Sequence, residues 1–325
     1  MGGLPGHGPV PRRPGGRTRR TTIRWVGAGL GTTALSLLAA GCGGNHSIVG
    51  PHGPEADRTA ALSWFMFALA GAITLFVFAL LGIGLFRHGS GEEHPRWWRR
   101  LVIGGGVIMP AIVLATLSGL TVWALSTDPG SRPGDVHITV VGRQYFWDVH
   151  YDGTAAVTAN EIHVPVDTPI RFTLKSADVI HSFWAPSLAG KVDMIPGHVN
   201  HLTVEVDDPG IYRGQCAELC GVQHANMAFE IVAQPRAAYE RWLAHQERDA
   251  PVPEDAEARK GLDVFTSQSC AGCHTIRGTS ATATVGPDLT HLASRRTIAA
   301  LTLPNDAAHL REWVFGAQQV KPGSE

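Results

Sequence analysis

The sequence predicts a multidomain membrane protein with a two-helix transmembrane hairpin, an all-β domain and a small all-α domain, in that order. Two charge-free apolar runs predict the hairpin. β-Branched segments of alternating polarity predict the β domain. A helical pattern around a Cys-x-x-Cys-His run near the C-terminus indicates the third domain. The formal net charge of −1 over 325 residues provides no basic field, so no nucleic-acid partner is expected.

Residues 1–42 are typical of an export signal. An arginine-rich start leads into an apolar stretch that ends in "LLAAGC". Cys42 resembles the cysteine of a bacterial lipobox, which carries lipid after cleavage, although Ala39 stands where Leu is usual. An ordinary signal peptide with an incidental cysteine is the alternative. In both cases the rest of the chain is expected to be exported or inserted in the membrane.

Residues 43–128 are predicted to form the transmembrane hairpin. Residues 60–86 and 101–127 contain no charged side chain, and each run exceeds the roughly 20 residues that span a bilayer as a helix. The segment between the runs is rich in arginine, which is typical of the cytoplasmic side. Its arginines are Arg87, Arg96, Arg99 and Arg100. Everything after residue 128 is therefore expected on the outer face of a bacterial plasma membrane. Two buried helices of a soluble core are the alternative, but charge-free runs of this length are rare there.

Residues 129–240 are predicted to form an all-β sandwich or barrel. The segments "VHITVVG", "IRFTLKS" and "HLTVEVDD" alternate in polarity and are bounded by Gly, Pro and Asp. The same domain contains "QCAELCGVQHANM", residues 215–227, which combines two thiols, an imidazole and a thioether. Thiolate, imidazole and thioether ligands together favour copper. A disulfide would leave the histidine and methionine unexplained, and a zinc site has little use for a thioether.

A second cysteine is one more than a mononuclear blue-copper site uses. Two thiolates can instead bridge two coppers, and each copper then needs its own imidazole. His224 can supply one of these. The other must come from a distant strand, and His181 in "IHSFWAPSLAGKVDMIPG" is the candidate. His198 and His201 are expected on the surface.

These two stretches resemble subunit II of the haem–copper cytochrome c oxidases, in which a binuclear copper centre, CuA, lies on a cupredoxin fold. The resemblance implies that Cys216 and Cys220 bridge both coppers. It further implies that His181 and Met227 complete one copper, and that His224 and the carbonyl of Glu218 complete the other. The implied partners are the haem–copper subunit I and a subunit III.

One stretch departs from the family pattern. The family usually has Gln-Trp-aromatic-Trp, whose first Trp resembles an acceptor site for electrons from a soluble cytochrome c. Here the stretch is "QYFW", with Tyr145 at the position of the first Trp. Direct electron transfer from a soluble donor to the copper domain is therefore in doubt.

A Pro-rich acidic linker, residues 241–255, precedes the third domain, residues 256–325. Cys270, Cys273 and His274 form the pattern of c-type haem attachment, in which two thiols bond the haem and the adjacent histidine ligates iron. A redox Cys-x-x-Cys or a disulfide is the alternative. The domain resembles the cytochrome c domain fused to subunit II in caa-type oxidases, which implies one covalent haem c. The family's distal ligand is a Met after "KPG"; no Met follows Met227, so we expect truncation, with His291 and His309 as weaker alternatives.

The resemblance implies the electron-accepting subunit of a cytochrome c oxidase. Electrons would pass from cytochrome c, or from a membrane cytochrome, to haem c, then to CuA, then to the haem of subunit I. Oxygen reduction and proton translocation would occur in that partner. A subunit of a CuA-containing nitric oxide reductase and a stand-alone membrane-bound electron carrier are the alternative functions.

Overall fold

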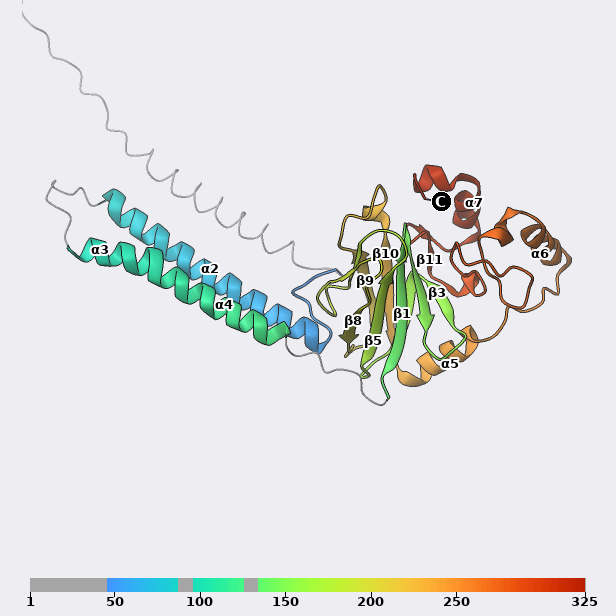
Figure 1. The fold of residues 1–325 in the computed structure, drawn as a ribbon, viewed down its shortest axis with the longest axis horizontal. Helices are drawn as coiled ribbons and strands as arrows, with labels where there is room; N and C mark the ends of the chain where they lie inside the picture. The colour runs from blue at the N-terminus through green and yellow to red at the C-terminus, as the bar shows by residue number, and fades with distance from the viewer. Residues whose placement is uncertain (1–45, 87–95, 126–133, 325) are drawn as a thin grey trace, which may run out of the picture. The chain divides into compact units, whose positions relative to one another are not determined.

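The computed structural model describes residues 46–86, 96–125 and 134–324 (Figure 1). The predicted signal segment with Cys42 lies outside the described residues, as does Arg87 in the loop between the two apolar runs.

The two apolar runs form the predicted helical hairpin. Helix α2 spans Pro54–Phe86, and the second run comprises α3 (Arg96–Ile103), a π-helical turn (Gly104–Ile108) and α4 (Met109–Leu125). Among the described helices, Pro54–Phe86 and Trp98–Ala124 are long and apolar enough to cross a membrane, with 33 and 27 residues. The π-turn ends two residues before Pro110, which lacks an N–H and whose ring crowds the preceding turn. A π-turn is thus the local irregularity that precedes the proline in this helix.

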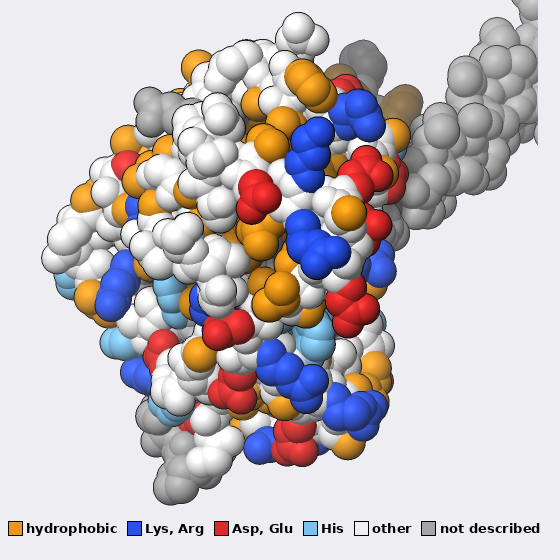
Figure 2. Space-filling model, turned by 90° about the vertical axis from the view of Figure 1, so that its right-hand side faces the viewer, with side chains coloured by type: hydrophobic (Ala, Val, Ile, Leu, Met, Phe, Trp, Pro, Cys, Tyr) orange, Lys and Arg blue, Asp and Glu red, His pale blue; other side chains and the backbone are white. Residues whose placement is uncertain are grey.

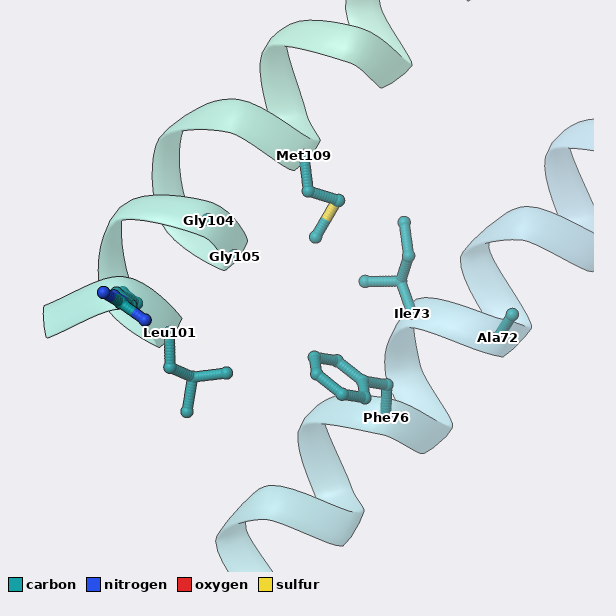
Figure 3. A pocket seen from close by; sticks show the side chains of 8 residues that line it. Ala72, Ile73, Phe76, Leu101, Gly104, Gly105 and Met109 are labelled. Atoms are coloured by element: carbon teal, nitrogen blue, oxygen red, sulfur yellow. The ribbon is translucent and has the colours of Figure 1, made fainter. Parts of the chain in front are cut away.

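An apolar hollow lies between α2 and the π-turn (Figure 3). Ile73 and Phe76 of α2 point into it from one side, and Leu101 and Met109 from the other. A Cβ atom added at Gly104 or Gly105 would meet nothing within 4 Å. The glycines therefore leave the hollow open along this face of the hairpin.

The middle of the chain forms the predicted β-sandwich, with two five-stranded sheets in the part that the structure describes. One sheet has the order β3-β2-β1-β5-β8, and the other has the order β4-β10-β9-β6-β7. Neighbouring strands are antiparallel except for the parallel pairs β1–β5 and β4–β10. The strands are β1 (Val136–Arg143), β2 (Phe146–Tyr151), β3 (Val157–Ala159), β4 (Glu161–Pro165), β5 (Ile170–Ser176), β6 (His181–Trp184), β7 (Val192–Met194), β8 (Asn200–Val204), β9 (Gly210–Cys216) and β10 (Ala228–Gln234).

Aromatic side chains fill the core between the two sheets. Trp147 of β2 is fully buried, and its ring makes edge contacts with Phe183 and Phe229 at centroid distances of 5.7 and 5.2 Å. Those two phenylalanines stack at 4.2 Å. A Cβ at Gly214 would lie 2.1 Å from the Phe229 ring, so this strand position must be glycine. The packed core makes β6, β9 and β10 a rigid support for what lies at their ends.

The C-terminal part is a small helical domain. Helix α5 (Arg236–Gln246) closes the β-sandwich and extends into the segment expected as a linker. Helices α6 (Ala256–Ser267) and α7 (Ala307–Val320) are capped by Asp255 and Asp306, whose carboxylates accept backbone N–H bonds. Short 3-10 turns (Ser269–Gly272 and Leu292–Ser294) and a two-stranded ladder, β11 (Thr297–Ile298) with β12 (Leu303–Pro304), connect them. The ladder is an addition that the sequence does not predict.

Candidate functional site

The expected copper ligands come from two neighbouring positions of one sheet. Residues 216–227, here called the metal loop, join β9 to β10, and its ends are tied by a bond from the Cys216 N–H to the Met227 carbonyl, 2.9 Å. His181 begins β6, which pairs with β9 so that Phe183 lies opposite Cys216. Sheet register therefore brings a histidine from 35 residues upstream beside the first cysteine.

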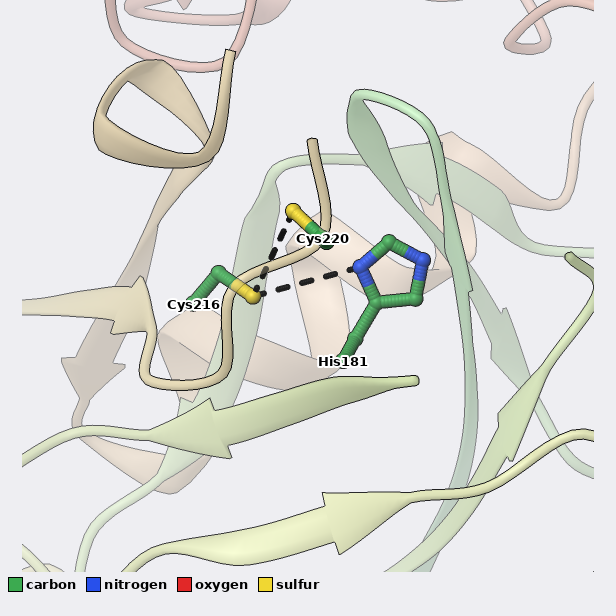
Figure 4. Close-up of side chains that lie close together, drawn as sticks. All are labelled: His181, Cys216 and Cys220. Atoms are coloured by element: carbon green, nitrogen blue, oxygen red, sulfur yellow. Dashed lines mark hydrogen bonds between the residues drawn. The ribbon is translucent and has the colours of Figure 1, made fainter. Parts of the chain in front are cut away.

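The ligand atoms lie close together (Figure 4). The Cys216 and Cys220 sulfurs are 3.8 Å apart, and Nδ1 of His181 is 3.9 Å from the Cys216 sulfur. Nδ1 of His224 and Sδ of Met227 lie 3.8 and 3.7 Å from the Cys220 sulfur. The Glu218 carbonyl oxygen is 3.2 Å from the Cys216 sulfur. All six residues expected from the sequence are therefore gathered at one place.

These spacings fit metal ligands better than a disulfide. A disulfide needs about 2.05 Å between sulfurs, much less than the 3.8 Å observed. Two sulfurs bonded to one tetrahedral metal at roughly 2.3 Å each lie about 3.8 Å apart. The buried Met227 thioether adds a soft ligand, which favours copper over zinc.

The two cysteines share their charge unequally. The Cys220 thiol beside Cys216 lowers the pKa of Cys216 to about 3, with further help from His181 and from backbone hydrogen bonds of the loop, while burial opposes the shift. The same contact raises the pKa of Cys220. Burial works against protonation of His181, but the Cys216 sulfur and Asp178 outweigh it and raise its pKa. The protein groups alone therefore hold one thiolate, ready for a cation, and the second proton would leave as metal binds.

Asp178 and Gln144 orient the ligands, and neither was expected from the sequence. Asp178 Oδ1 lies 2.7 Å from Nε2 of His181, so Nδ1 is the nitrogen that faces the cysteines. The other Asp178 oxygen accepts the Gln144 N–H at 2.7 Å, and the Gln144 amide donates to the Cys220 carbonyl. A Cβ at Gly142 would lie 2.8 Å from the His181 ring, so glycine makes room for the imidazole.

Replacing Asp178 with asparagine is expected to lower copper affinity about 10- to 100-fold. The change keeps the side-chain shape but removes the charge that holds the His181 tautomer. Copper affinity is measured by competition with a chelator. The matched control is Asp208→Asn, which removes a carboxylate 3.7 Å from the half-exposed His52. Equal affinity in the Asp178 and Asp208 variants would contradict this role.

Tyr145 lies beneath the metal loop. Its ring is buried, and its hydroxyl accepts the Val222 N–H at 3.2 Å. A Cβ at Gly221 would lie 2.4 Å from that hydroxyl, so the loop passes directly over the phenol. Replacement of Tyr145 by alanine would therefore disturb the loop as well as any electron path, and phenylalanine is the cleaner substitution.

Tyr145→Phe is expected to cost about 0.5–1.5 kcal/mol of unfolding free energy, because it removes the hydrogen bond that the Val222 N–H donates to the Tyr145 hydroxyl. Turnover with an external donor should stay nearly unchanged, since the ring stays in place. Denaturant unfolding and oxygen uptake measure the two effects. A large fall in turnover with normal copper loading would make Tyr145 part of the electron path.

The Cys-x-x-Cys-His run lies in a turn after α6. Cys270 and Cys273 are exposed, and the His274 N–H donates to the Cys270 carbonyl at 3.0 Å. Nδ1 of His274 lies 2.8 Å from the Pro287 carbonyl, so Nδ1–H donates there and Nε2 is left for iron. A Cβ at Gly286 would lie 2.5 Å from the His274 ring. The turn thus presents two thiols and one oriented imidazole, a donor set that fits a covalent haem.

Several apolar side chains of this domain remain exposed, and Figure 2 shows apolar patches on the face that it draws. The exposed large apolar residues of the domain are Val264, Val285, Val314 and Phe315. A flat apolar ligand such as a porphyrin would cover surface of this kind.

Two weaker histidine candidates are engaged elsewhere. Nε2 of His291 bonds the Arg248 carbonyl at 2.9 Å, and Nδ1 of His309 lies 2.7 Å from Asp306 at the start of α7. His198 and His201 are exposed, as expected from the sequence.

Comparisons with known proteins agree with both modules. The family model described as cytochrome C oxidase subunit II, periplasmic domain, matches residues 154–234, and the model described as cytochrome c matches residues 258–324. The cytochrome c oxidase subunit 2 of Alkalihalophilus pseudofirmus is 32% identical, covering 89% of this chain and 88% of the relative. That of Bacillus sp. (strain PS3) is 30% identical, covering 90% and 88%. The crystal structure of the periplasmic domain of subunit II of cytochrome oxidase of Bradyrhizobium japonicum is 30% identical with a TM-score of 0.34, covering 35% of this chain and 95% of that chain.

Proposed function

This chain belongs to the cytochrome c oxidase subunit 2 family, and we propose that it passes electrons from a covalent haem c through a binuclear copper centre to the large oxidase subunit. Its fused cytochrome c domain makes it an electron-accepting subunit of a membrane oxidase. Oxygen reduction and proton translocation belong to the haem–copper partner, subunit I.

The observation that carries the proposal is the gathering of the ligand atoms at the ends of β6, β9 and β10. Cys216 and Cys220 would bridge the two coppers, His181 with Met227 would hold one, and His224 with the Glu218 carbonyl would hold the other. When bound, such a centre supplies a one-electron carrier whose charge is shared between two metals.

The surrounding residues keep this centre closed. Cys216 and Cys220 are each 3% exposed and Met227 is fully buried, so water has little access to the sulfur ligands. Asp178 and Gln144 hold the His181 and Cys220 segments in one geometry. A rigid, closed ligand set suits electron transfer, which needs no position for a substrate.

In the second module, Cys270 and Cys273 would bond the haem and His274 would ligate its iron. The fusion holds the haem at high effective concentration relative to the copper domain. We further propose that the hairpin spans the bacterial plasma membrane with both redox domains on the outer face. The donor would be cytochrome c or a membrane cytochrome, and subunit III a further companion.

Purification of the chain from its native membrane in mild detergent tests the function. We expect it to co-purify with a haem a-containing subunit and to support oxygen uptake with a reduced donor. A stand-alone carrier would bring no haem a, and a nitric oxide reductase subunit would reduce nitric oxide in place of oxygen. Either of these results would refute the oxidase proposal.

A further inference from the structure

The turn that follows α7 contacts the metal loop directly. Residues 321–323, here called the docking turn, follow α7. The Pro322 carbonyl accepts a bond from the Gln223 side-chain amide at 2.7 Å. A Cβ at Gly323 would lie 2.8 Å from the Val222 side chain. The docking turn therefore packs on the part of the metal loop between Cys220 and His224.

Lys321 anchors this turn beneath the loop. Its side chain is 2% exposed, and its ammonium donates to the Tyr145 carbonyl at 2.8 Å and to the Ala299 carbonyl at 3.3 Å. Tyr145 in turn holds the metal loop through its hydroxyl. One residue thus links the haem-binding domain, through Tyr145, to the loop that carries the copper ligands.

A buried lysine is a poor source of stability. Burial lowers the pKa of Lys321 to about 8, which reflects the cost of removing its charge from water. Hydrogen bonds to the Tyr145 and Ala299 carbonyls offset that cost, and an apolar side chain at this position would leave both carbonyls without this donor. The lysine fixes the relative orientation of the two domains, because its hydrogen bonds form only when the carbonyls of both domains are in place.

A second contact fixes the domain at another point of the β-sandwich. The Arg296 N–H donates to the Glu161 carboxylate at 2.8 Å, and the Arg296 side chain bonds Glu230 at 3.2 Å. Glu161 and Glu230 are register partners on β4 and β10. Burial opposes ionisation of Glu161, but bonds from His163 and Arg296 outweigh it and lower its pKa, so the carboxylate stays charged. Two separated attachment points restrict rotation as well as translation.

We propose that Lys321 is a positioning residue that docks the haem-binding domain on the metal loop in one orientation, through the Tyr145 carbonyl. This proposal rests on the proposed function. The docking turn and Arg296 would hold the haem-binding domain against the β-sandwich. The haem would then stay near the copper ligands and would not have to diffuse on its linker to reach its electron acceptor. Because the haem is part of the chain, position 145 does not need an aromatic residue that accepts electrons from a separate cytochrome.

The test compares Lys321→Met with Lys260→Met in the full-length chain. Lys260 is an exposed lysine of α6 in the same domain, so both variants lose one positive charge from that domain. Hydrogen exchange is followed in peptides that contain the Arg296 amide, which donates across the domain boundary and needs no cofactor to report docking. In loaded protein, photoreduction of the haem is followed by the rate of electron appearance on copper.

Lys321→Met is expected to speed exchange at Arg296 and to slow haem-to-copper transfer by about tenfold each, the loss expected for one charged hydrogen bond. The copper spectrum, the haem spectrum and reduction of the haem by an external donor should not change. Lys321→Arg should retain most of the docking, which guards against a folding defect in the methionine variant. Lys260→Met should match the unmodified chain.

Unchanged exchange at Arg296, or unchanged transfer between the two groups, in the Lys321→Met protein would overturn the proposal. A chain that binds neither copper nor haem would refute the proposed function instead. In that case the exchange result alone would still decide whether Lys321 docks the domains.

Discussion

Cys216→Ser is expected to abolish the binuclear copper signal and to lower oxidase turnover by more than about a hundredfold. Loss of a residue that only orients a metal ligand costs up to about a hundredfold, and loss of a ligand itself should cost more. Cys216 lies at the centre of the cluster, within 4 Å of Cys220, His181 and the Glu218 carbonyl. A hydroxyl is nearly isosteric with the thiol but is a hard, protonated ligand that cannot bridge two soft metals.

The measurements are copper content, the visible and EPR spectra, and oxygen uptake. His201→Ala removes an exposed histidine of the same domain and should leave all three unchanged. A similar melting temperature in both variants shows that the fold is kept. Two coppers retained in the Cys216→Ser protein, with an unaltered spectrum, would mean that this sulfur is not a bridge.

Replacing both Cys270 and Cys273 with alanine is expected to remove the covalent haem while copper loading stays complete. These thiols lie on the turn after α6, and the copper ligands lie at the ends of β6, β9 and β10, so the sites are built independently. Turnover with an external donor should fall by about a hundredfold or more, because the donor loses its tethered relay and the gain in effective concentration.

Haem staining of the denatured chain, copper analysis and donor-dependent oxygen uptake measure these effects. Gly261→Ala, at a position of α6 where a Cβ meets nothing within 4 Å, is the control for a tolerated change in this domain. Haem that stays attached after denaturation of the double variant would show that other residues hold it. Unimpaired turnover without haem would show that electrons reach the copper domain directly.

The parts that follow from local chemistry could be predicted from the sequence. The apolar runs predict the hairpin because a helix that spans a bilayer needs an uninterrupted apolar segment. The spacing of residues 216–227 predicts a metal loop because the ligands are close together in the sequence. Placing His181 at the site required only one long-range contact, the pairing of β6 with β9. Asp178, Gln144 and Gly142 required the full sheet register, since each acts on a ligand from another segment.

Contacts between domains were beyond prediction for the same reason. Lys321 lies in the "KPG" segment that precedes the distal haem ligand in the family. Nothing in the neighbouring sequence indicates that its side chain bonds the Tyr145 carbonyl. Tyr145 itself was recognisable as a departure from the family pattern, but its role in supporting Val222 depends on the folded loop. The π-turn before Pro110 likewise reflects how a helix absorbs a proline that the sequence can only locate.

The most direct test of the central claim is metal and haem analysis, with EPR, of the purified full-length chain. The account predicts two coppers that share one unpaired electron, together with one covalently attached haem. Zinc at this position, or a native Cys216–Cys220 disulfide, would contradict it.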